Sequence, residues 1–352
     1  MKILQIGPSE TRSRGGMAAV IRGIRESRTL NSEFEIESFP SYIDGSLPVR
    51  LLYSGYGYLR FLLCYKKYDL FHIHTAERGS TFRKNLYLRT IKRAGKRAIV
   101  HIHGAEYLTF YDRLNGRRKK TVDRFFQRAN LVIALSDSWK RELESRFCMN
   151  ACQTLYNGVS PEAFQEAAVD PAKHRNAFLM LGRLGERKGT YDLIDAVELA
   201  VRQNSELTVY LAGDGETEKA KALIAEKKLE KHIIVMGWID GTKKLELLKN
   251  TAAVILPSYN EGLPMAILEG MAAGKAIIST SVGAIPEVVT TENGILIEPG
   301  NVSALAEALL RCSRDVEMLR EMSRANMEMI ERRFSVRRMH ERLADYYREV
   351  MK

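Results

Sequence analysis

Short apolar runs alternate with longer amphipathic stretches along the whole chain, and this alternation constrains the fold more than any other feature. The runs expected to form strands in the first half are residues 2–6, 34–39, 70–74, 98–103, 131–135 and 153–156. Those in the second half are 177–181, 207–212, 233–236, 253–256, 276–280 and 294–297. Nearly continuous apolar strands that alternate with helical patterns are typical of parallel sheets covered on both faces. The sequence therefore predicts an α/β fold with doubly wound sheets.

A chain of 352 residues is long enough for two such domains. We expect a first Rossmann-like domain over residues 1–165 and a second over 172–336, joined by a polar linker. The helical tail over 337–352 follows the last strand, and the sequence leaves open whether it packs back on the first domain. Ligands of open parallel sheets bind at the carboxyl ends of strands where the strand order reverses. Residues that directly follow strands are therefore the candidates for chemistry.

Two cationic side chains follow the first strand of the second half. Arg183 comes after Gly182, and Lys188 comes five residues later, just before a helical pattern. A guanidinium and an ammonium at the carboxyl end of one strand can bind the two phosphates of a diphosphate. Arg187 is expected to be solvated. The alternative interpretation is a charged surface turn without function.

Two glutamates separated by seven residues, Glu261 and Glu269, follow a later strand of the second half. Pro264 between them suits the first turn of a helix, so the N–H groups near Gly262 and Leu263 would face an anion. Glu261, in the loop, can accept hydrogen bonds from sugar hydroxyls, and Glu269 from ribose hydroxyls. The alternatives are a helix cap for the first glutamate and an exposed helix charge for the second.

Two glycines and a histidine in the first half also follow strands. Gly15 and Gly16 open a helical pattern, where backbone N–H groups can approach a phosphate. Their spacing differs from the GxGxxG pattern of dinucleotide-binding proteins, which disfavours a dehydrogenase. His103 lies at the end of a strand, immediately before Gly104, and is a candidate active-site residue.

Three further histidines accompany it in two His-Ile-His pairs, at positions 72, 74 and 101. Strand alternation puts both members of each pair on one face of the sheet. We expect these three to be structural or to line the acceptor site. A metal cluster is the alternative, but no carboxylate spacing supports it.

The net charge of +11 is concentrated in the first half of the chain. Residues 1–160 carry 28 Lys and Arg against 14 Asp and Glu, whereas the remainder carries 26 against 29. Basic clusters over 78–97 and 117–120, with an apolar-aromatic stretch over 51–63, predict docking on an anionic membrane surface. The alternative is a solvated basic face beside a core helix. Nucleic acid is not expected as a partner because no binding motif accompanies the charge.

No stretch predicts a membrane span or a signal peptide. The most apolar stretch, over 49–65, is interrupted by Arg50 and Arg60, whereas a spanning helix needs about 20 mostly apolar residues. The N-terminal apolar run ends at Gly7, which is too short for a signal-peptide core. We therefore expect a cytoplasmic protein, peripheral at most to the inner face of the membrane. The four cysteines match no metal or redox spacing and are expected to be reduced.

Arg183 and Lys188, followed by Glu261 and Glu269, resemble the motif of the retaining glycosyltransferases of family 4, which have the GT-B fold. The resemblance extends to Gly15-Gly16, to His103-Gly104 and to the segments 213–215 and 283–287, and it is strongest over 177–299. It implies two Rossmann-like domains that face each other across a cleft. It also implies transfer of a hexose, with retention, from a nucleoside-diphosphate sugar to a glycan or lipid-linked acceptor in cell-surface polysaccharide biosynthesis. UDP is the expected nucleotide on family frequency alone.

The resemblance also implies a role for each motif residue. Arg183 and Lys188 would hold the donor diphosphate, Glu261 would contact the transferred sugar, and Glu269 would contact the ribose. His103 would lie near the reaction centre, and Gly16 near the distal phosphate. The base would lie against the turn that contains Trp238 and Ile239.

No Asp-x-Asp pair occurs in the sequence. We therefore expect neither a metal nor a cofactor besides the sugar-nucleotide co-substrate. Two other functions stay open. A UDP-sugar 2-epimerase would share the two-domain architecture but needs acid and base carboxylates at C2 of the sugar, which the sequence does not place. A non-enzymatic membrane- or polysaccharide-binding protein would leave the phosphate-facing residues unexplained.

Overall fold

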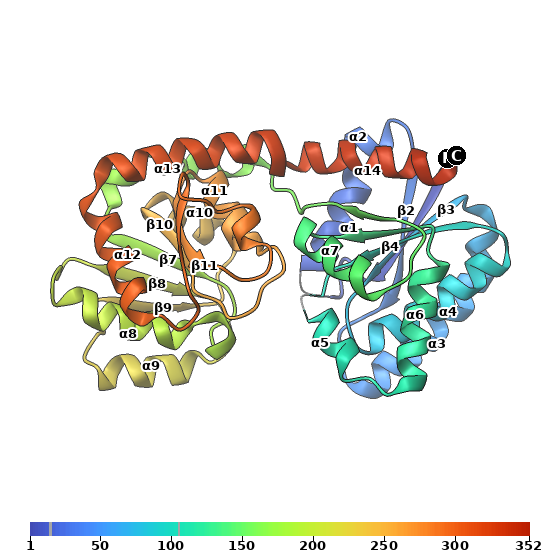
Figure 1. Ribbon diagram of the computed structural model, residues 1–352, viewed down its shortest axis with the longest axis horizontal. Helices are drawn as coiled ribbons and strands as arrows, with labels where there is room; N and C mark the ends of the chain where they lie inside the picture. The colour runs from blue at the N-terminus through green and yellow to red at the C-terminus, as the bar shows by residue number, and fades with distance from the viewer. Residues whose placement is uncertain (14–15, 105) are drawn as a thin grey trace. The chain divides into compact units, whose positions relative to one another are not determined.

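The chain folds into two compact units, each built on a six-stranded sheet with helices packed around it (Figure 1). A computed structural model describes residues 1–13, 16–104 and 106–352. The first unit comprises Met1–Asn157 together with Arg337–Lys352, and the second comprises Gly158–Val336. All strand pairings within the two sheets are parallel. The predicted fold class, α/β with two Rossmann-like domains, is confirmed.

The sheet of the first unit has the strand order β2-β1-β3-β4-β5-β6. Its strands are β1 (Lys2–Pro8), β2 (Glu35–Tyr42), β3 (Leu70–Thr75), β4 (Arg97–Ile102), β5 (Leu131–Ala134) and β6 (Cys152–Thr154). The chain runs outward from β1 to β2 and then returns to pair β3 with the other side of β1. The strand order therefore reverses between β1 and β3, and the carboxyl ends of these two strands border the crevice where ligands of such sheets bind.

The helices of the first unit are α1 (Gly16–Glu26), α2 (Arg28–Asn31), α3 (Leu47–Cys64), α4 (Gly79–Arg93), α5 (Tyr107–Asp112), α6 (Gly116–Arg128), α7 (Asp137–Arg146) and α14 (Val336–Met351). Side-chain caps fix several of their starts. Asn115 accepts a hydrogen bond from the N–H of Arg118 at the start of α6, and Ser136 accepts one from the N–H of Trp139 at the start of α7. Helix α14 packs on this unit through Tyr347, whose ring meets that of Phe34 edge to face at 5.4 Å.

The sheet of the second unit has the order β12-β11-β10-β7-β8-β9. Its strands are β7 (Ala177–Leu181), β8 (Thr208–Ala212), β9 (Ile233–Gly237), β10 (Ala253–Leu256), β11 (Ala276–Thr280) and β12 (Gly294–Ile297). Its α-helices are α8 (Thr190–Val201), α9 (Thr217–Glu226), α10 (Gly241–Lys249), α11 (Met265–Ala272), α12 (Val302–Arg314) and α13 (Val316–Met329). The strand order reverses between β7 and β10, so the loops after these two strands border the crevice of this unit.

The segment expected to be an interdomain linker is part of the second unit. It forms two short 3-10 helices, Pro161–Ala167 and Pro171–His174, and buries the side chains of Phe164 and Ala167. Val159 exchanges backbone hydrogen bonds with Phe334 and Val336, at the far end of the same unit. Because these apolar groups pack into the second unit, the division falls at Asn157 and Gly158, earlier than residue 165.

Candidate active site

The loop after β7, which carries Arg183, lies directly against the loop after β8. The N–H of Gly182 donates to the carbonyl of Ala212 at 3.0 Å, and the N–H of Leu184 donates to that of Asp214 at 2.7 Å. A Cβ atom on Gly213 would lie 1.8 Å from the carbonyl oxygen of Gly182, so a side chain there is sterically excluded. This close backbone contact fixes the loop, from which Arg183 extends as an exposed side chain without an ion pair among the described residues.

Lys188 contacts Glu261 and so joins the loops after β7 and β10. The Lys188 ammonium forms an ion pair with Oε1 of Glu261, and the two side chains are 15% and 8% exposed. The same oxygen accepts a hydrogen bond from Ser258 Oγ at 2.7 Å. Oε2 of Glu261 makes no hydrogen bond within the described part of the chain and stays available to a ligand.

Two further contacts hold these loops together. Gly189 has a φ of 69°, and a Cβ atom there would lie 2.1 Å from the carbonyl oxygen of Pro257. The guanidinium of Arg187 donates to the carbonyl of Asn260 at 2.9 Å, and the Arg187 carbonyl accepts from the N–H of Tyr259 at the same distance. Arg187 is exposed, as expected, but it also fastens the loop that carries Glu261.

Helix α11 begins later than expected. Pro264 has an extended conformation (φ −74°, ψ 125°) and precedes the first helical residue, Met265, so its expected place in the first turn is wrong. Gly283 approaches the same loop closely, since a Cβ atom there would lie 1.9 Å from the Glu261 carbonyl. Within the described chain the N–H groups of Gly262 and Leu263 donate no hydrogen bond. They are therefore free to bind an anion.

Glu269 and Trp238 lie farther along the same edge of the sheet. Glu269, on α11, is 19% exposed and accepts a hydrogen bond at 2.7 Å from Lys244 of α10. Sequence reasoning missed Lys244, whose only local signal is its place in a lysine pair near the start of a helix. Trp238 follows β9 and is 76% exposed, and Ile239 is half-buried.

The second unit thus brings most of its expected residues to one edge. Lys188, Glu261 and the segment with Gly262 and Leu263 lie together, and Arg183 projects from the same loop as Lys188. The loop after β9 is linked to them because the N–H of Gly213 donates to the carbonyl of Gly237 at 2.7 Å. No described contact joins Trp238, Ile239 or Glu269 directly to Lys188.

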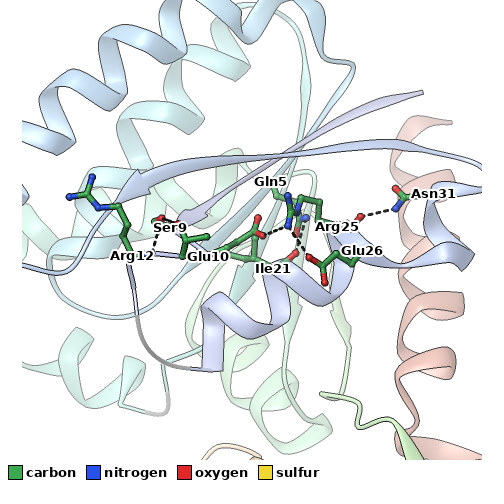
Figure 2. Close-up of polar contacts among 9 residues, drawn as sticks. Gln5, Ser9, Glu10, Arg12, Ile21, Arg25, Glu26 and Asn31 are labelled. Carbon is green, nitrogen blue, oxygen red and sulfur yellow. Dashed lines mark hydrogen bonds and ion pairs between the residues drawn. The ribbon is translucent and has the colours of Figure 1, made fainter. Parts of the chain in front are cut away.

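In the first unit, Gly15 lies outside the described residues, whereas Gly16 is exposed and opens α1. His103 follows β4, and its Nε2 lies 2.9 Å from Nδ1 of His74. Nε2 of His74 lies 3.0 Å from Oε1 of Gln5. The amide nitrogen of Gln5 donates to the carbonyl of Ile21 at 3.2 Å (Figure 2). Oε1 of Gln5 therefore accepts the proton on His74 Nε2, and neutral His74 accepts from His103. This assignment leaves the lone pair of His103 on Nδ1.

The three other histidines form a buried network below His103. Nδ1 of His72 lies 2.8 Å from the hydroxyl of Tyr347, and Nε2 of His72 lies 3.2 Å from Nδ1 of His101. One ring nitrogen from each of His72, His74 and His101 lies within 4.8 Å of the others, as in a metal site. However, both nitrogens of His72 and of His74 already have partners. We therefore interpret the network as hydrogen-bonded core that positions His103.

These histidines should make the first unit sensitive to acid. Burial lowers the pKa of His72 and His103 to about 3, and the pKa values of His74 and His101 well below 6.5. Each imidazole is neutral in the folded protein, whereas it takes up a proton near pH 6.5 once unfolded. The free energy of unfolding should therefore fall as the pH drops from 7 to 5, by up to about 1.4 kcal/mol per pH unit and histidine.

Chemical denaturation at pH 7, 6 and 5 measures this dependence. A His101→Asn variant should lose stability less steeply with pH than the wild-type protein, since it has one fewer group to protonate on unfolding. Equal slopes for the two proteins would contradict the assignment.

Two family models together match residues 24–329. The model of group 1 glycosyl transferases matches residues 162–329, and the model of glycosyltransferase family 4 matches residues 24–163. Among curated proteins, the amylovoran biosynthesis glycosyltransferase AmsK of Erwinia amylovora is 27% identical over 70% of this chain and 61% of its own length. The putative colanic acid biosynthesis glycosyltransferase WcaL of Escherichia coli is 26% identical over 78% of this chain and 69% of its own length.

Solved structures show the same fold at low sequence identity. Anabaena Alr3699/HepE, solved in complex with UDP, has a TM-score of 0.80 at 18% identity and covers 99% of this chain and 100% of that one. Sucrose-phosphate synthase from Thermosynechococcus elongatus has the same TM-score and identity, with 99% and 98% coverage.

Proposed function

Because the chain belongs to the GT-B group 1 glycosyltransferases, we propose that it transfers a sugar from a nucleoside-diphosphate sugar to a glycan or lipid-linked acceptor. The observation that carries the proposal is the contact between Lys188 and Glu261, which lie at the crevice of the second unit beside two unbonded N–H groups. Relatives named for amylovoran, colanic acid and teichuronic acid biosynthesis support a role in making a cell-surface polysaccharide.

Each group at this edge suits one part of the donor. Lys188, Arg183 and the N–H groups of Gly262 and Leu263 bind the diphosphate. Oε2 of Glu261 accepts a hydroxyl of the transferred sugar, while its Oε1 holds Lys188 in place.

The nucleoside lies farther along the edge. Glu269, held by Lys244, accepts the ribose hydroxyls, and the base lies against the turn with Trp238 and Ile239. UDP is the proposed nucleotide because structural neighbours were solved with UDP and UDP-glucose. For Gly16 at the distal phosphate and His103 near the transferred sugar, the proposal rests on the family resemblance.

The chemical step is departure of the diphosphate as positive charge develops on the sugar. Lys188, Arg183 and the two N–H groups stabilise the negative charge on the leaving oxygen, so the described residues supply the electrostatic stabilisation without a metal. The family resemblance supports retention at the anomeric carbon. We propose that the leaving phosphate accepts the proton of the acceptor hydroxyl, which then attacks from the same face.

A thermal-shift screen against UDP, GDP, ADP and their sugars tests this function, since a ligand that binds only the folded state raises the melting temperature. UDP and a UDP-sugar should raise it most. Incubation with UDP-N-acetylglucosamine and no acceptor provides a second readout, in which accumulation of the 2-epimer would contradict glycosyl transfer. If the protein bound liposomes but no nucleotide raised its melting temperature, an enzymatic role would be contradicted.

Helix α3 supports membrane association. Leu51, Leu52, Leu59 and Leu63 on this helix are 64%, 76%, 64% and 89% exposed, whereas Phe61 on its other face is fully buried. The exposed basic residues around this apolar face are Arg50, Arg60, Lys66 and Lys67. No helix in the described chain is both long and apolar enough to cross a membrane. We propose that α3 lies in the plane of an anionic membrane surface, on the cytoplasmic side.

A double substitution, Leu52→Glu with Leu63→Glu, should lower binding to phosphatidylglycerol vesicles by about tenfold or more. Full burial of one leucine contributes about 1.5–3 kcal/mol, so even partial insertion of two exceeds the 1.4 kcal/mol of a tenfold effect. Vesicle co-sedimentation measures the binding of each variant. Leu199→Glu on α8, where the leucine is 37% exposed, is the matched control and should bind as the wild-type protein does. Unchanged binding of the double variant would exclude α3 as the docking face.

A further inference from the structure

A cavity of about 390 Å³ lies in the first unit, at the place where its strand order reverses. Pro8 ends β1, Tyr42 ends β2, and Glu77 follows β3, and all three line it. Helix α4 contributes Arg83, and α3 contributes Arg50. The carboxyl ends of β1 and β3 are where an open parallel sheet binds its ligand. Apart from Gly16, no lining residue has a part in the donor chemistry above.

Three buried polar atoms at this cavity lack hydrogen-bond partners within the described chain. They are Oγ of Ser13, Oε2 of Glu77 and Nε of Arg83. Buried polar groups in folded proteins nearly always have a partner. The unpaired Nε of Arg83 is a cationic donor, so it indicates an anionic ligand.

Two guanidinium groups of the wall lie beside the same aromatic ring. Those of Arg83 and Arg50 lie 4.8 and 5.3 Å from the ring centre of Tyr42, and neither forms an ion pair with a described residue. Burial lowers the pKa of Arg83, as expected for a cation without an anionic partner. Two guanidinium groups beside one ring together match the charge of a phosphate monoester.

The two acidic residues of the wall, Glu77 and Asp44, have other contacts. A Cβ atom on Gly104 would lie 1.7 Å from Oε2 of Glu77, so this carboxylate packs against the backbone that follows His103. Asp44 also lines the cavity and has an interaction partner. Below them, fully buried Lys84 donates to the carbonyl of Ile6 at 3.0 Å and to the hydroxyl of Ser41.

We propose that this cavity binds the acceptor through a phosphate group, held by Arg83 and Arg50. The identification as acceptor rests on the proposed glycosyltransferase function. Arg50 precedes Leu51 and Leu52, whose side chains belong to the exposed apolar face of α3. A phosphate bound by Arg50 therefore lies beside a surface suited to an alkyl chain, which favours a lipid phosphate over a soluble sugar phosphate.

Isothermal titration of the full chain with octyl phosphate, glucose 1-phosphate and octyl glucoside tests this proposal. Octyl phosphate should bind most tightly, and Arg83→Gln should weaken its binding by about tenfold or more. Arg97→Gln, at the start of β4 and thus at the opposite edge of the sheet, is the matched control and should leave the binding unchanged. Should Arg83→Gln not fold, Arg50→Gln on the exposed side of α3 should show the same loss.

The three ligands separate the outcomes. Equal binding of octyl phosphate to wild-type and Arg83→Gln proteins would overturn the proposal. It would also be overturned if Arg83→Gln weakened the binding of octyl glucoside as much as that of octyl phosphate. If glucose 1-phosphate bound as tightly as octyl phosphate, the lipid part would be wrong. UDP titrated into the same samples reports on the donor site separately. If octyl phosphate binding depended on Arg83 but the protein did not bind UDP, the proposed donor would be wrong. The proposed phosphate ligand of the cavity would still hold.

Discussion

Replacing Lys188 by alanine lowers the turnover number for sugar transfer by about 100- to 1,000-fold, the usual loss when one preorganised group that stabilises the transition state is removed. The loss is expected to be large because the ammonium is only 15% exposed and is held by Glu261. An ammonium in such a position needs little reorganisation when charge develops on the leaving oxygen. A steady-state assay of UDP release measures the effect.

Lys231→Ala is the matched control, because Lys231 is an exposed lysine of the same unit and has no ion pair among the described residues. It should keep wild-type turnover. Lys188→Ala should also lower the free energy of unfolding by about 1–3 kcal/mol, since Glu261 loses its cation while buried. Wild-type turnover in Lys188→Ala would exclude the lysine from the reaction, whatever its effect on stability.

Substituting alanine for Gly189 should both destabilise the second unit and abolish transfer. The φ of 69° alone costs an L-residue about 1–2 kcal/mol. A Cβ atom 2.1 Å from the carbonyl oxygen of Pro257 must in addition push the start of α8 away from the loop after β10. We expect a total loss of about 3 kcal/mol or more in the free energy of unfolding. The same displacement would separate Lys188 from Glu261.

Gly237→Ala separates the two causes. Gly237 has a φ of 67°, but a Cβ atom at this position would meet no other group within 4 Å. Its substitution should therefore cost only the conformational part, about 1–2 kcal/mol. Urea denaturation of both variants measures the difference. If the two variants were equally stable, the contact with Pro257 would not be what fixes the loop.

The sequence predicted the strands of both sheets because each is a short apolar run between polar or glycine turns. It also placed Arg183, Lys188 and Glu261 at the carboxyl ends of strands, where the topology brings the loops after β7 and β10 together. The pairing of Lys188 with Glu261 could not be predicted, since it depends on contacts between loops that lie 73 residues apart.

Other features depend on tertiary structure in the same way. The start of α11 was misplaced because proline favours the first turn of a helix, whereas Pro264 is extended here and precedes the first helical residue. The partner of Glu269, Lys244, comes from a neighbouring helix. The sequence showed that α3 is rich in apolar residues. Which side of the helix stays exposed follows only from the structure, where Gly57 and Phe61 are buried.

The most direct test of the account is the affinity of the second unit's site for a diphosphate. Titration calorimetry with UDP and with uridine should be compared for the wild-type, Arg183→Ala and Lys188→Ala proteins. The cationic side chains are proposed to bind phosphate, so both variants should bind UDP about tenfold more weakly or worse, with no change in their affinity for uridine. If both variants bound UDP as the wild-type protein does, the diphosphate would lie elsewhere and the proposed site would be wrong.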